Sequence, residues 1–115
     1  MTPQNNNLYS HYQKQFIKFK NKPALRLIDN KTIYYKDLEK ESAKIANYLR
    51  DLGVKIGDRV SVQVQKSPEA LYLYLACLRA GFVYHPLNVG YKEHELDFFF
   101  QNAKPSLVVC DESNL

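Results

Sequence analysis

The sequence is poor in glycine, proline and cysteine, and it lacks tryptophan and any long apolar run. Its 115 residues include 4 Gly, 5 Pro and 2 Cys. Because the glycines are isolated, neither Gly-x-Gly-x-x-Gly nor a P-loop occurs, and no glycine-rich loop can direct its backbone N–H groups at a phosphate. No apolar run approaches the ~20 residues that span a bilayer. Polar residues also interrupt the first apolar cluster, unlike in a secretory signal. We therefore expect a cytoplasmic protein with no membrane span.

The two cysteines, Cys77 and Cys110, both lie inside apolar segments. Free cysteine is among the most often buried residue types, so we expect two buried, reduced thiols rather than a disulfide. No Cys-x-x-Cys motif or His/Cys cluster has metal-ligand spacing. The histidines His11, His85 and His94 are scattered along the chain. We therefore expect no metal site.

Positive charge is concentrated near the N-terminus. The formal net charge is +4, and within the first 36 residues seven lysines and arginines accompany a single acidic residue, Asp29. One interpretation is a small nucleic-acid binder. No arginine cluster, row of stacking aromatics or known binding motif accompanies the basic residues, and this favours a solvated face. We therefore expect no nucleic-acid partner.

The first third of the chain predicts a helix and a hairpin. Residues 1–7, MTPQNNN, have the composition of a disordered N-terminus, and residues 8–115 are expected to form one domain. Apolar side chains then recur with helical period, which predicts an amphipathic helix that packs on its own domain; they are Leu8, Tyr9, Tyr12, Phe16, Ile17 and Phe19. A helix lying on a membrane surface is the alternative. The segments PALRLID and TIYY flank a turn at Asn30, which tolerates positive φ, and predict a β-hairpin.

The rest of the chain alternates between helix and strand. We expect a helix from about residue 36 to Leu52, capped by Gly53, and a strand over 59–65 in which valines alternate with polar residues. The buried stripe expected for this helix contains Leu38, Ser42, Ile45, Ala46, Leu49 and Leu52. A helix over 68–80, ended by Gly81, leads at once into a strand over 82–85. Pro86 has no backbone N–H, so we expect it to end the hydrogen bonding of this strand to its neighbour. A further helix, KEHELDFFFQNA, with Leu96, Phe99 and Phe100 inward, precedes the strand SLVVC.

Strand, helix and strand in this order predict βαβ units with right-handed crossovers. The expected fold class is α/β. It is an incomplete open parallel sheet with helices on its faces, preceded by a helix and a short β-hairpin. The last strand contains Val108 and Val109, which have the pattern of a buried strand, yet only DESNL follows. The sheet therefore reads as interrupted.

Ligands of parallel sheets usually bind beyond the carboxyl ends of the strands, and three residues there are candidates. Ser67 precedes a helix N-terminus that could receive an anion, although helix capping explains Ser-Pro-Glu by itself. His85 is the best-placed general base, but the sequence implies no carboxylate partner for it. Asp111 ends a strand and is typical of a residue that begins a loop. Spacing and periodicity alone therefore predict a fold class and no active site.

Two stretches of the sequence resemble a known family. The segments TIYYKDLEKESAKIANYLRDLGVKIGDRVSVQV and KSPEALYLYLACLRAGFVYHPLN resemble the N-terminal part of the adenylate-forming acyl-CoA synthetases of the AMP-dependent synthetase/ligase superfamily. KSPEALYLYLACLRAG, PLNVGY and ELDFFF…AKPSLVVCD are most similar to malonyl-CoA synthetases. His85 departs from the apolar residue often found at its position. The resemblance extends over nearly the whole chain from about Pro23, so residues 8–115 are expected to form a partial AMP-binding domain.

The resemblance implies a ligase that works in two steps. A carboxylate attacks the α-phosphate of ATP to form an acyl-adenylate, and the thiol of coenzyme A then displaces AMP. Intact members use ATP, Mg²⁺ and coenzyme A, and the groups that bind them belong to motifs that lie downstream of the matched region. No catalytic, cofactor-binding or metal residue is therefore carried over, and the chain alone is expected to bind no cofactor.

Two hypotheses follow for function. In the first, the chain is a truncated N-terminal piece of a malonyl-CoA-synthetase-like ligase, inactive by itself. In the second, it is a non-catalytic interaction module that complements a separately encoded remainder of the synthetase. The unfinished sheet edge and an aromatic-rich composition, with 9 Tyr and 6 Phe, motivate the second hypothesis.

Overall fold

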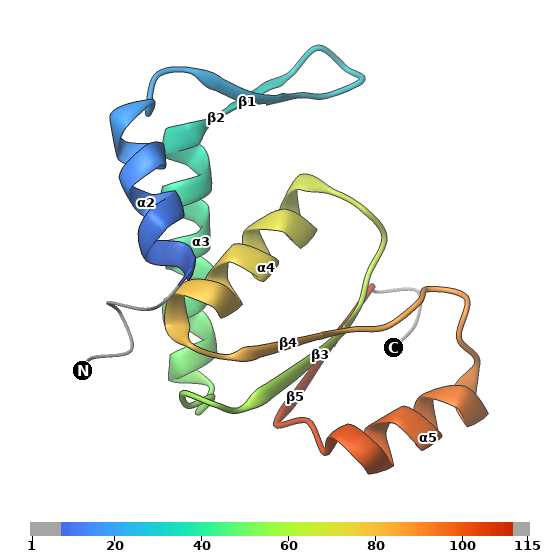
Figure 1. The fold of residues 1–115 in the computed structure, drawn as a ribbon. Helices are drawn as coiled ribbons and strands as arrows, with labels where there is room; N and C mark the ends of the chain where they lie inside the picture. Colours follow the sequence, from blue (N-terminus) through green and yellow to red (C-terminus); the bar gives the residue numbers. More distant parts are fainter. Residues whose placement is uncertain (1–7, 112–115) are drawn as a thin grey trace.

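The structure, a computed structural model, describes residues 8–111, so the expected disorder of residues 1–7 lies outside it. The described elements are, in chain order, α2 (Leu8–Lys18), β1 (Pro23–Arg26), β2 (Thr32–Tyr34), α3 (Tyr35–Asp51), β3 (Arg59–Gln63), α4 (Pro68–Ala80), β4 (Val83–Pro86), α5 (Glu93–Ala103) and β5 (Leu107–Cys110). Figure 1 shows α2 and α3 side by side, with α4 crossing between them and the sheet.

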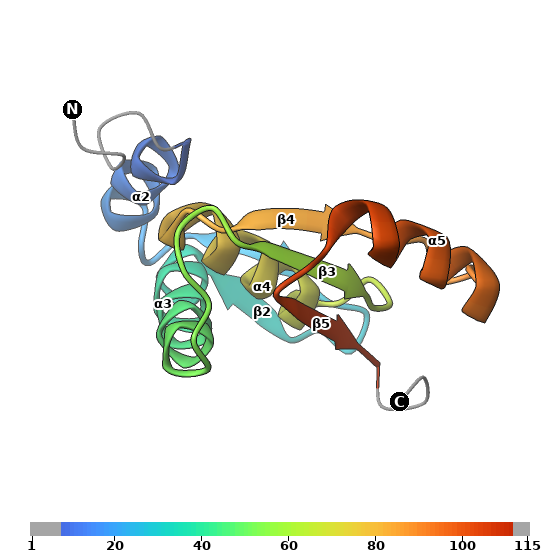
Figure 2. The same cartoon turned by 90° about the horizontal axis from the view of Figure 1, so that it is seen from below.

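Strands β3, β4 and β5 form a parallel sheet in the order β4-β3-β5. The central strand β3 places Ser61 opposite both His85 of β4 and Val108 of β5. In the view of Figure 1, α4 lies above the sheet and α5 lies below it, and Figure 2 shows the same layers from below. The predicted α/β fold class, with helices on the faces of a parallel sheet, is confirmed.

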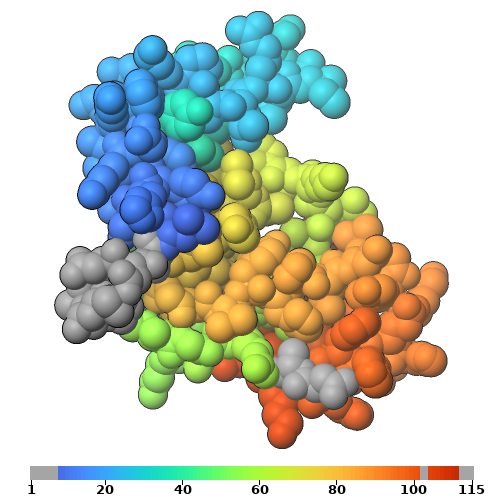
Figure 3. Space-filling model, viewed as in Figure 1, coloured from blue at the N-terminus to red at the C-terminus, as the bar shows by residue number. Residues whose placement is uncertain are grey.

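The predicted β-hairpin is also present. Strands β1 and β2 pair in antiparallel fashion, and Asn30 takes a φ of 68° in the turn between them. The backbone N–H of Leu27 donates to the carbonyl of Lys31 at 2.8 Å, and the carboxylate of Asp29 accepts from the N–H of Lys31 at 3.0 Å. In the space-filling view the hairpin and α2 occupy the end of the molecule opposite α5 (Figure 3).

The junction between α4 and β4 depends on a left-handed glycine. Gly81 follows α4 with a φ of 80°, a conformation that costs glycine little because it has no Cβ. The chain reverses there, and the N–H of Phe82 donates to the carbonyl of Cys77 at 2.9 Å. The carbonyl of Gly81 accepts from the N–H of Gly57 at 2.8 Å, which fixes the turn before β3 against the end of α4.

Two groups of buried side chains hold the layers together. The first joins α3 and α4 to the sheet and contains Ala46, Leu49, Val54, Val60, Val62, Leu73, Ala76, Cys77, Ala80 and Phe82. The second joins α2, the hairpin, α3 and α4, and contains Tyr9, Phe16, Ile33, Leu38, Tyr72 and Leu75. Since α3 and α4 contribute to both groups, these two helices connect the N-terminal end of the molecule to the sheet.

Several apolar residues that were expected to be buried are exposed. Leu8, Tyr12 and Ile17 of α2 are 48%, 39% and 58% exposed, because α2 contacts the domain mainly through Tyr9 and Phe16. Leu52 is 53% exposed because it lies beyond the last turn of α3. Val108 is 45% exposed, contrary to its expected burial, because β5 is an edge strand that, within residues 8–111, pairs with β3 alone.

Strand ends also differ from expectation. Strand β3 ends at Gln63 rather than at residue 65. The backbone N–H of Gln65 donates to the side chain of Asp111 instead of to a neighbouring strand. Pro86 belongs to β4 and does not end its hydrogen bonding, since the N–H of Leu87 still donates to the carbonyl of Val62 at 2.8 Å. Proline is tolerated here because β4 pairs on one side only.

Helix α5 is only partly buried against the rest of the domain. Its expected inward residues, Leu96, Phe99 and Phe100, are half-buried, and Phe98 is 63% exposed. Phe99 stacks on Tyr91 with ring centroids 4.9 Å apart, so part of its apolar surface is covered by the loop that leads into its own helix.

Candidate functional site

The three candidates from the sequence do lie near the carboxyl ends of the parallel strands, but each has a structural role. The hydroxyl of Ser67 accepts a hydrogen bond from the N–H of Ala70 at 3.1 Å, and Pro68 occupies the first turn of α4. This is the geometry of a helix N-cap. The interpretation of Ser67 as a capping residue is therefore confirmed.

His85 has a partner that sequence reasoning missed. Its Nδ1 lies 2.8 Å from the hydroxyl of Ser61, the residue directly opposite it on β3. Ser61 is fully buried, so its hydroxyl has no access to a substrate from solvent. The pair joins the polar sides of two neighbouring strands. The polar residues that alternate with valine in β3 were the only sequence signal for this contact. The register between β3 and β4 decides which of these residues faces His85.

Asp111 connects the ends of two strands. Its Oδ2 atom accepts a hydrogen bond at 3.0 Å from the backbone N–H of Gln65, 46 residues earlier in the chain. Gln63 performs a similar task at the carboxyl end of β3, where its Nε2 donates to the carbonyls of Asn88 and Tyr91 at 2.9 and 3.3 Å. These contacts hold the sheet's carboxyl edge and the loop that precedes α5.

The most connected polar group of the described chain is Arg79, which the sequence analysis did not single out. Its Nη2 lies 3.0 Å from Oε1 of Glu39, in an ion pair whose side chains are 19% and 26% exposed. Its Nη1 lies 3.0 Å from the Tyr9 hydroxyl, 3.0 Å from the Ser42 hydroxyl and 2.9 Å from the Glu39 carbonyl. The guanidinium also lies over the Tyr9 ring, 4.5 Å from its centroid. This Arg79 cluster therefore ties α2, α3 and α4 together.

Both carboxylate oxygens of Glu39 accept hydrogen bonds. Oε1 accepts from Nε2 of Gln13 at 2.9 Å as well as from Arg79, and Oε2 accepts from the Tyr9 hydroxyl. Burial raises the pKa of Glu39, but the hydrogen bonds from Tyr9 and Gln13 and the charge of Arg79 outweigh it, so the net pKa is lowered. Burial, followed by the bond to Glu39, raises the pKa of Tyr9 to about 12. At neutral pH the cluster is therefore an arginine cation, a carboxylate anion and a neutral phenol.

Cys77 is buried as the sequence predicts, whereas Cys110 is not, because it ends the edge strand β5. Both are free; Cys77 is fully buried and Cys110 is half-buried. Burial raises the pKa of the Cys77 thiol to about 11, so it carries almost no reactive thiolate at neutral pH. Over residues 8–111, no group of three or more His, Cys, Asp or Glu side chains is arranged to hold a metal ion. The same range contains no helix long and apolar enough to cross a membrane.

Comparison with known proteins identifies the family of the chain. The family model described as AMP-binding enzyme matches residues 12–115. The chain belongs to the AMP-binding enzyme family.

Among relatives of this AMP-binding chain, the acetyl-coenzyme A synthetase of Bradyrhizobium sp. (strain ORS 278) is 34% identical over 87 residues, which are 76% of this chain and 13% of that protein. Apo MatB from Rhodopseudomonas palustris is 44% identical with a TM-score of 0.85, and ATP-bound MatB is 43% identical with a TM-score of 0.88. Both comparisons cover 93% of this chain and 21% of MatB. The chain thus spans about one fifth of these two solved proteins, and it corresponds to the N-terminal part of an adenylate-forming enzyme.

Proposed function

We propose that this region is the N-terminal scaffold of a malonyl-CoA-synthetase-like acyl-CoA ligase and does not catalyse acyl-adenylate formation by itself. The observation that carries the proposal is the similarity to MatB, at 44% identity over 93% of this chain, joined to a coverage of only 21% of MatB. The role of the described residues is then architectural. Ser67, Asp111 and Gln63 order the carboxyl edge of the sheet, and the Arg79 cluster fixes three helices behind it.

Under this proposal ATP, Mg²⁺ and coenzyme A bind to groups supplied by the rest of a ligase, and no residue of 8–111 is assigned to catalysis, cofactor binding or a metal. The chemistry of residues 8–111 supports this assignment. Ser61 is buried and hydrogen-bonded to His85, the Cys77 thiol is buried and protonated, and the Asp111 carboxylate accepts from a backbone N–H. The cytoplasmic location expected from the sequence is part of this proposal.

The experiment is to measure pyrophosphate release from ATP by the purified 115-residue chain with malonate, acetate or no acid. The expected result is no release above the rate without protein. Turnover that depends on malonate would contradict the proposed inactivity, and turnover that depends on acetate would also contradict the substrate assignment. A ligase formed by joining this region to the remaining four fifths of R. palustris MatB should prefer malonate, if this region is a competent scaffold.

A second function, that of an interaction module complementing a separately encoded ligase remainder, is supported by the edge of the sheet. Among the described residues, strand β5 pairs only with β3. Beside it lies an apolar groove of about 290 Å³ whose lining includes Ile45, Tyr48 and Val109. Open strand edges next to apolar surface are suited to pairing with a further polypeptide segment.

This second function is tested by co-expressing the tagged chain with the part of MatB that lies beyond the matched region. Co-purification in equal amounts would support it, and Tyr48→Lys should then reduce recovery because Tyr48 is 62% exposed at the groove. Ile56→Lys is the matched control, since Ile56 is 69% exposed and does not line the groove. Equal recovery of both variants would contradict docking at this groove.

A further inference from the structure

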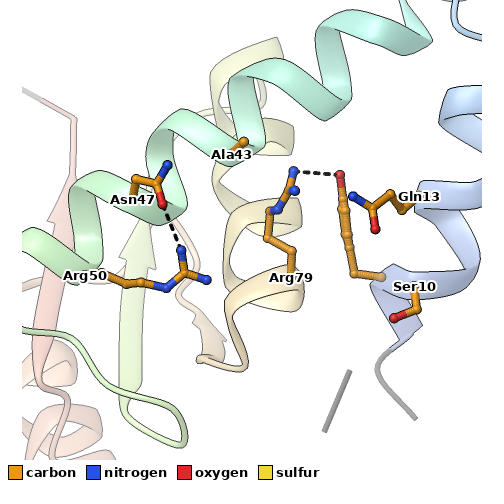
Figure 4. A pocket seen from close by; sticks show the side chains of 7 residues that line it. Ser10, Gln13, Ala43, Asn47, Arg50 and Arg79 are labelled. Atoms are coloured by element: carbon orange, nitrogen blue, oxygen red, sulfur yellow. Dashed lines mark hydrogen bonds between the residues drawn. The ribbon is translucent and has the colours of Figure 1, made fainter. Parts of the chain in front are cut away.

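A polar cavity lies next to the Arg79 cluster, between α2, α3 and α4. Its volume is about 330 Å³, at the lower end of the range for small-molecule sites. Its lining includes Tyr9, Ser10 and Gln13 of α2, Asn47 and Arg50 of α3, and Arg79 of α4. Figure 4 shows the labelled side chains of the three helices converging on this space. No Asp or Glu belongs to the described lining.

The two arginines of the cavity differ in how their charges are compensated. The guanidinium of Arg79 is paired with Glu39 and held by Tyr9 and Ser42, so its charge is neutralised and its position is fixed. Arg50 instead donates from Nη1 to the neutral Oδ1 of Asn47 at 2.9 Å. Within residues 8–111 no carboxylate lies within ion-pair distance of Arg50. The cavity therefore carries one uncompensated positive charge, which favours an anion.

The amide side chains indicate what else the ligand carries. Because Oδ1 of Asn47 accepts from Arg50, the Nδ2 group of Asn47 is left as a donor beside the guanidinium. Because Nε2 of Gln13 donates to Glu39, the Oε1 atom of Gln13 is left as an acceptor on the opposite wall. A guanidinium and an amide donor suit a carboxylate or phosphate group, and an acceptor on the opposite wall suits a hydroxyl group.

We infer that this cavity binds a small hydroxylated oxyanion. Arg50 and Asn47 hold its carboxylate or phosphate group, Gln13 accepts from its hydroxyl, and the Arg79 cluster fixes the wall of the site. The site is separate from the carboxyl edge of the sheet, because α3 and α4 contribute its residues from the side that faces α2. It is therefore independent of the ligase scaffold proposed above.

The test is a titration of the ¹⁵N-labelled 115-residue chain followed by NMR, using the amide signals of Ser10, Ala43, Asn47 and Arg50. The probes are glycerate, propionate, glycerol 3-phosphate and inorganic phosphate. We expect saturable shifts at these amides with a Kd of about 1 mM or tighter for glycerate, glycerol 3-phosphate or both. Propionate and inorganic phosphate should bind more weakly because they lack the carbon-bound hydroxyl. Binding of only one organic probe assigns the anionic group as carboxylate or phosphate.

Matched variants separate a built site from general attraction to positive charge. Arg50→Gln should weaken binding at least tenfold, because it removes the uncompensated cation. Arg26→Gln removes the same charge from an exposed position on β1 and should leave binding unchanged. The inference is overturned if no probe gives saturable shifts at the cavity. It is also overturned if both variants weaken binding equally, or if propionate and inorganic phosphate bind as tightly as their hydroxylated counterparts.

Discussion

The guanidinium of Arg79 on α4 and the carboxylate of Glu39 on α3 lie 3.0 Å apart, 40 residues from each other in the chain. Tyr9 of α2 contacts both partners, donating its hydroxyl proton to Glu39 and accepting from Arg79. The pair is thus the point at which the N-terminal helix is joined to the helices that cover the sheet. Its partial burial makes the loss of one partner costly, because the other keeps its charge in a poorly solvated position.

Arg79→Met should destabilise the domain by about 2 kcal/mol. The substitution keeps most of the side-chain length but leaves the Glu39 carboxylate without its cation, and the partial exposure of both side chains keeps the loss below that of a fully buried pair. Urea unfolding followed by circular dichroism measures the change. The control is Glu41→Gln, which removes the exposed pair between Glu41 and Lys44 and should change stability by less than about 0.5 kcal/mol. Similar losses in the two variants would show that the Arg79 cluster adds little.

Stability should fall in acid because of Glu39. Its hydrogen bonds and Arg79 hold its folded pKa below the ordinary value of 4.5. The stabilisation is therefore complete above about pH 4.5 and is lost as the pH falls through the lower folded value. Urea titrations between about pH 3 and 6 should give a smaller slope of stability against pH for Glu39→Gln than for the unchanged chain. Identical slopes would contradict the assignment of this pH dependence to Glu39.

At alkaline pH the sign is reversed for Tyr9. Its pKa rises from 10.0 to about 12 in the folded state, so the folded chain retains a phenol proton that the unfolded chain loses. The stabilisation from the protonated phenol is present below about pH 10 and decreases as the pH rises toward about 12. Burial also raises the pKa values of Tyr72 and Tyr84, so tyrosinate absorbance should show a late-titrating component that becomes smaller, by one tyrosine, in Tyr9→Phe. Tyr48→Phe, at a 62% exposed position, is the control and should leave that late titration in place.

Gly81→Ala should destabilise the domain more than Gly57→Ala. Both glycines have left-handed backbone, with φ of 80° and 87°, so each alanine incurs about 1 kcal/mol of strain. An added Cβ at Gly81 would also lie 3.3 Å from Cγ2 of Ile56, whereas nothing lies within 4 Å of one at Gly57. Thermal unfolding of the two variants measures the difference. Equal losses would show that Ile56 moves aside without cost.

Ser67→Ala should lower stability by about 1 kcal/mol, because the N–H of Ala70 loses its acceptor at the first turn of α4. Ser67→Asp should restore most of the loss, since a carboxylate can accept the same bond near the positive end of the helix. Denaturant midpoints compare the three proteins. Failure of aspartate to restore stability would point to a role for Ser67 other than capping.

Local signals made much of the fold predictable. Ser67, Pro68 and Gly81 mark the ends of α4, and the structure places α4 at Pro68–Ala80. The alternation of valine and polar residues marks β3, and Asn30 marks the hairpin turn. These signals depend on backbone conformation within a few residues, so they can be interpreted without knowing what lies across the domain.

Burial was predicted less well, because it depends on neighbours distant in the chain. Val108 matches a buried strand residue by pattern, yet it is 45% exposed because β5, in the part of the chain that the structure describes, has a partner on one side only. Nothing in the sequence pattern of α4, which is mostly apolar, marked Arg79 as important. Its importance arises because Tyr9 and Glu39 reach it from two other helices.

The sequence by itself determined where the chain turns, which segments are helix or strand and that the parallel units follow one another, because capping, periodicity and glycine conformation act locally. The tertiary structure alone decided that His85 meets Ser61, that Asp111 holds Gln65 and that two arginines face one polar cavity. Those meetings depend on strand register and helix packing, which are set by many weak contacts between distant segments. No short pattern in the sequence encodes them.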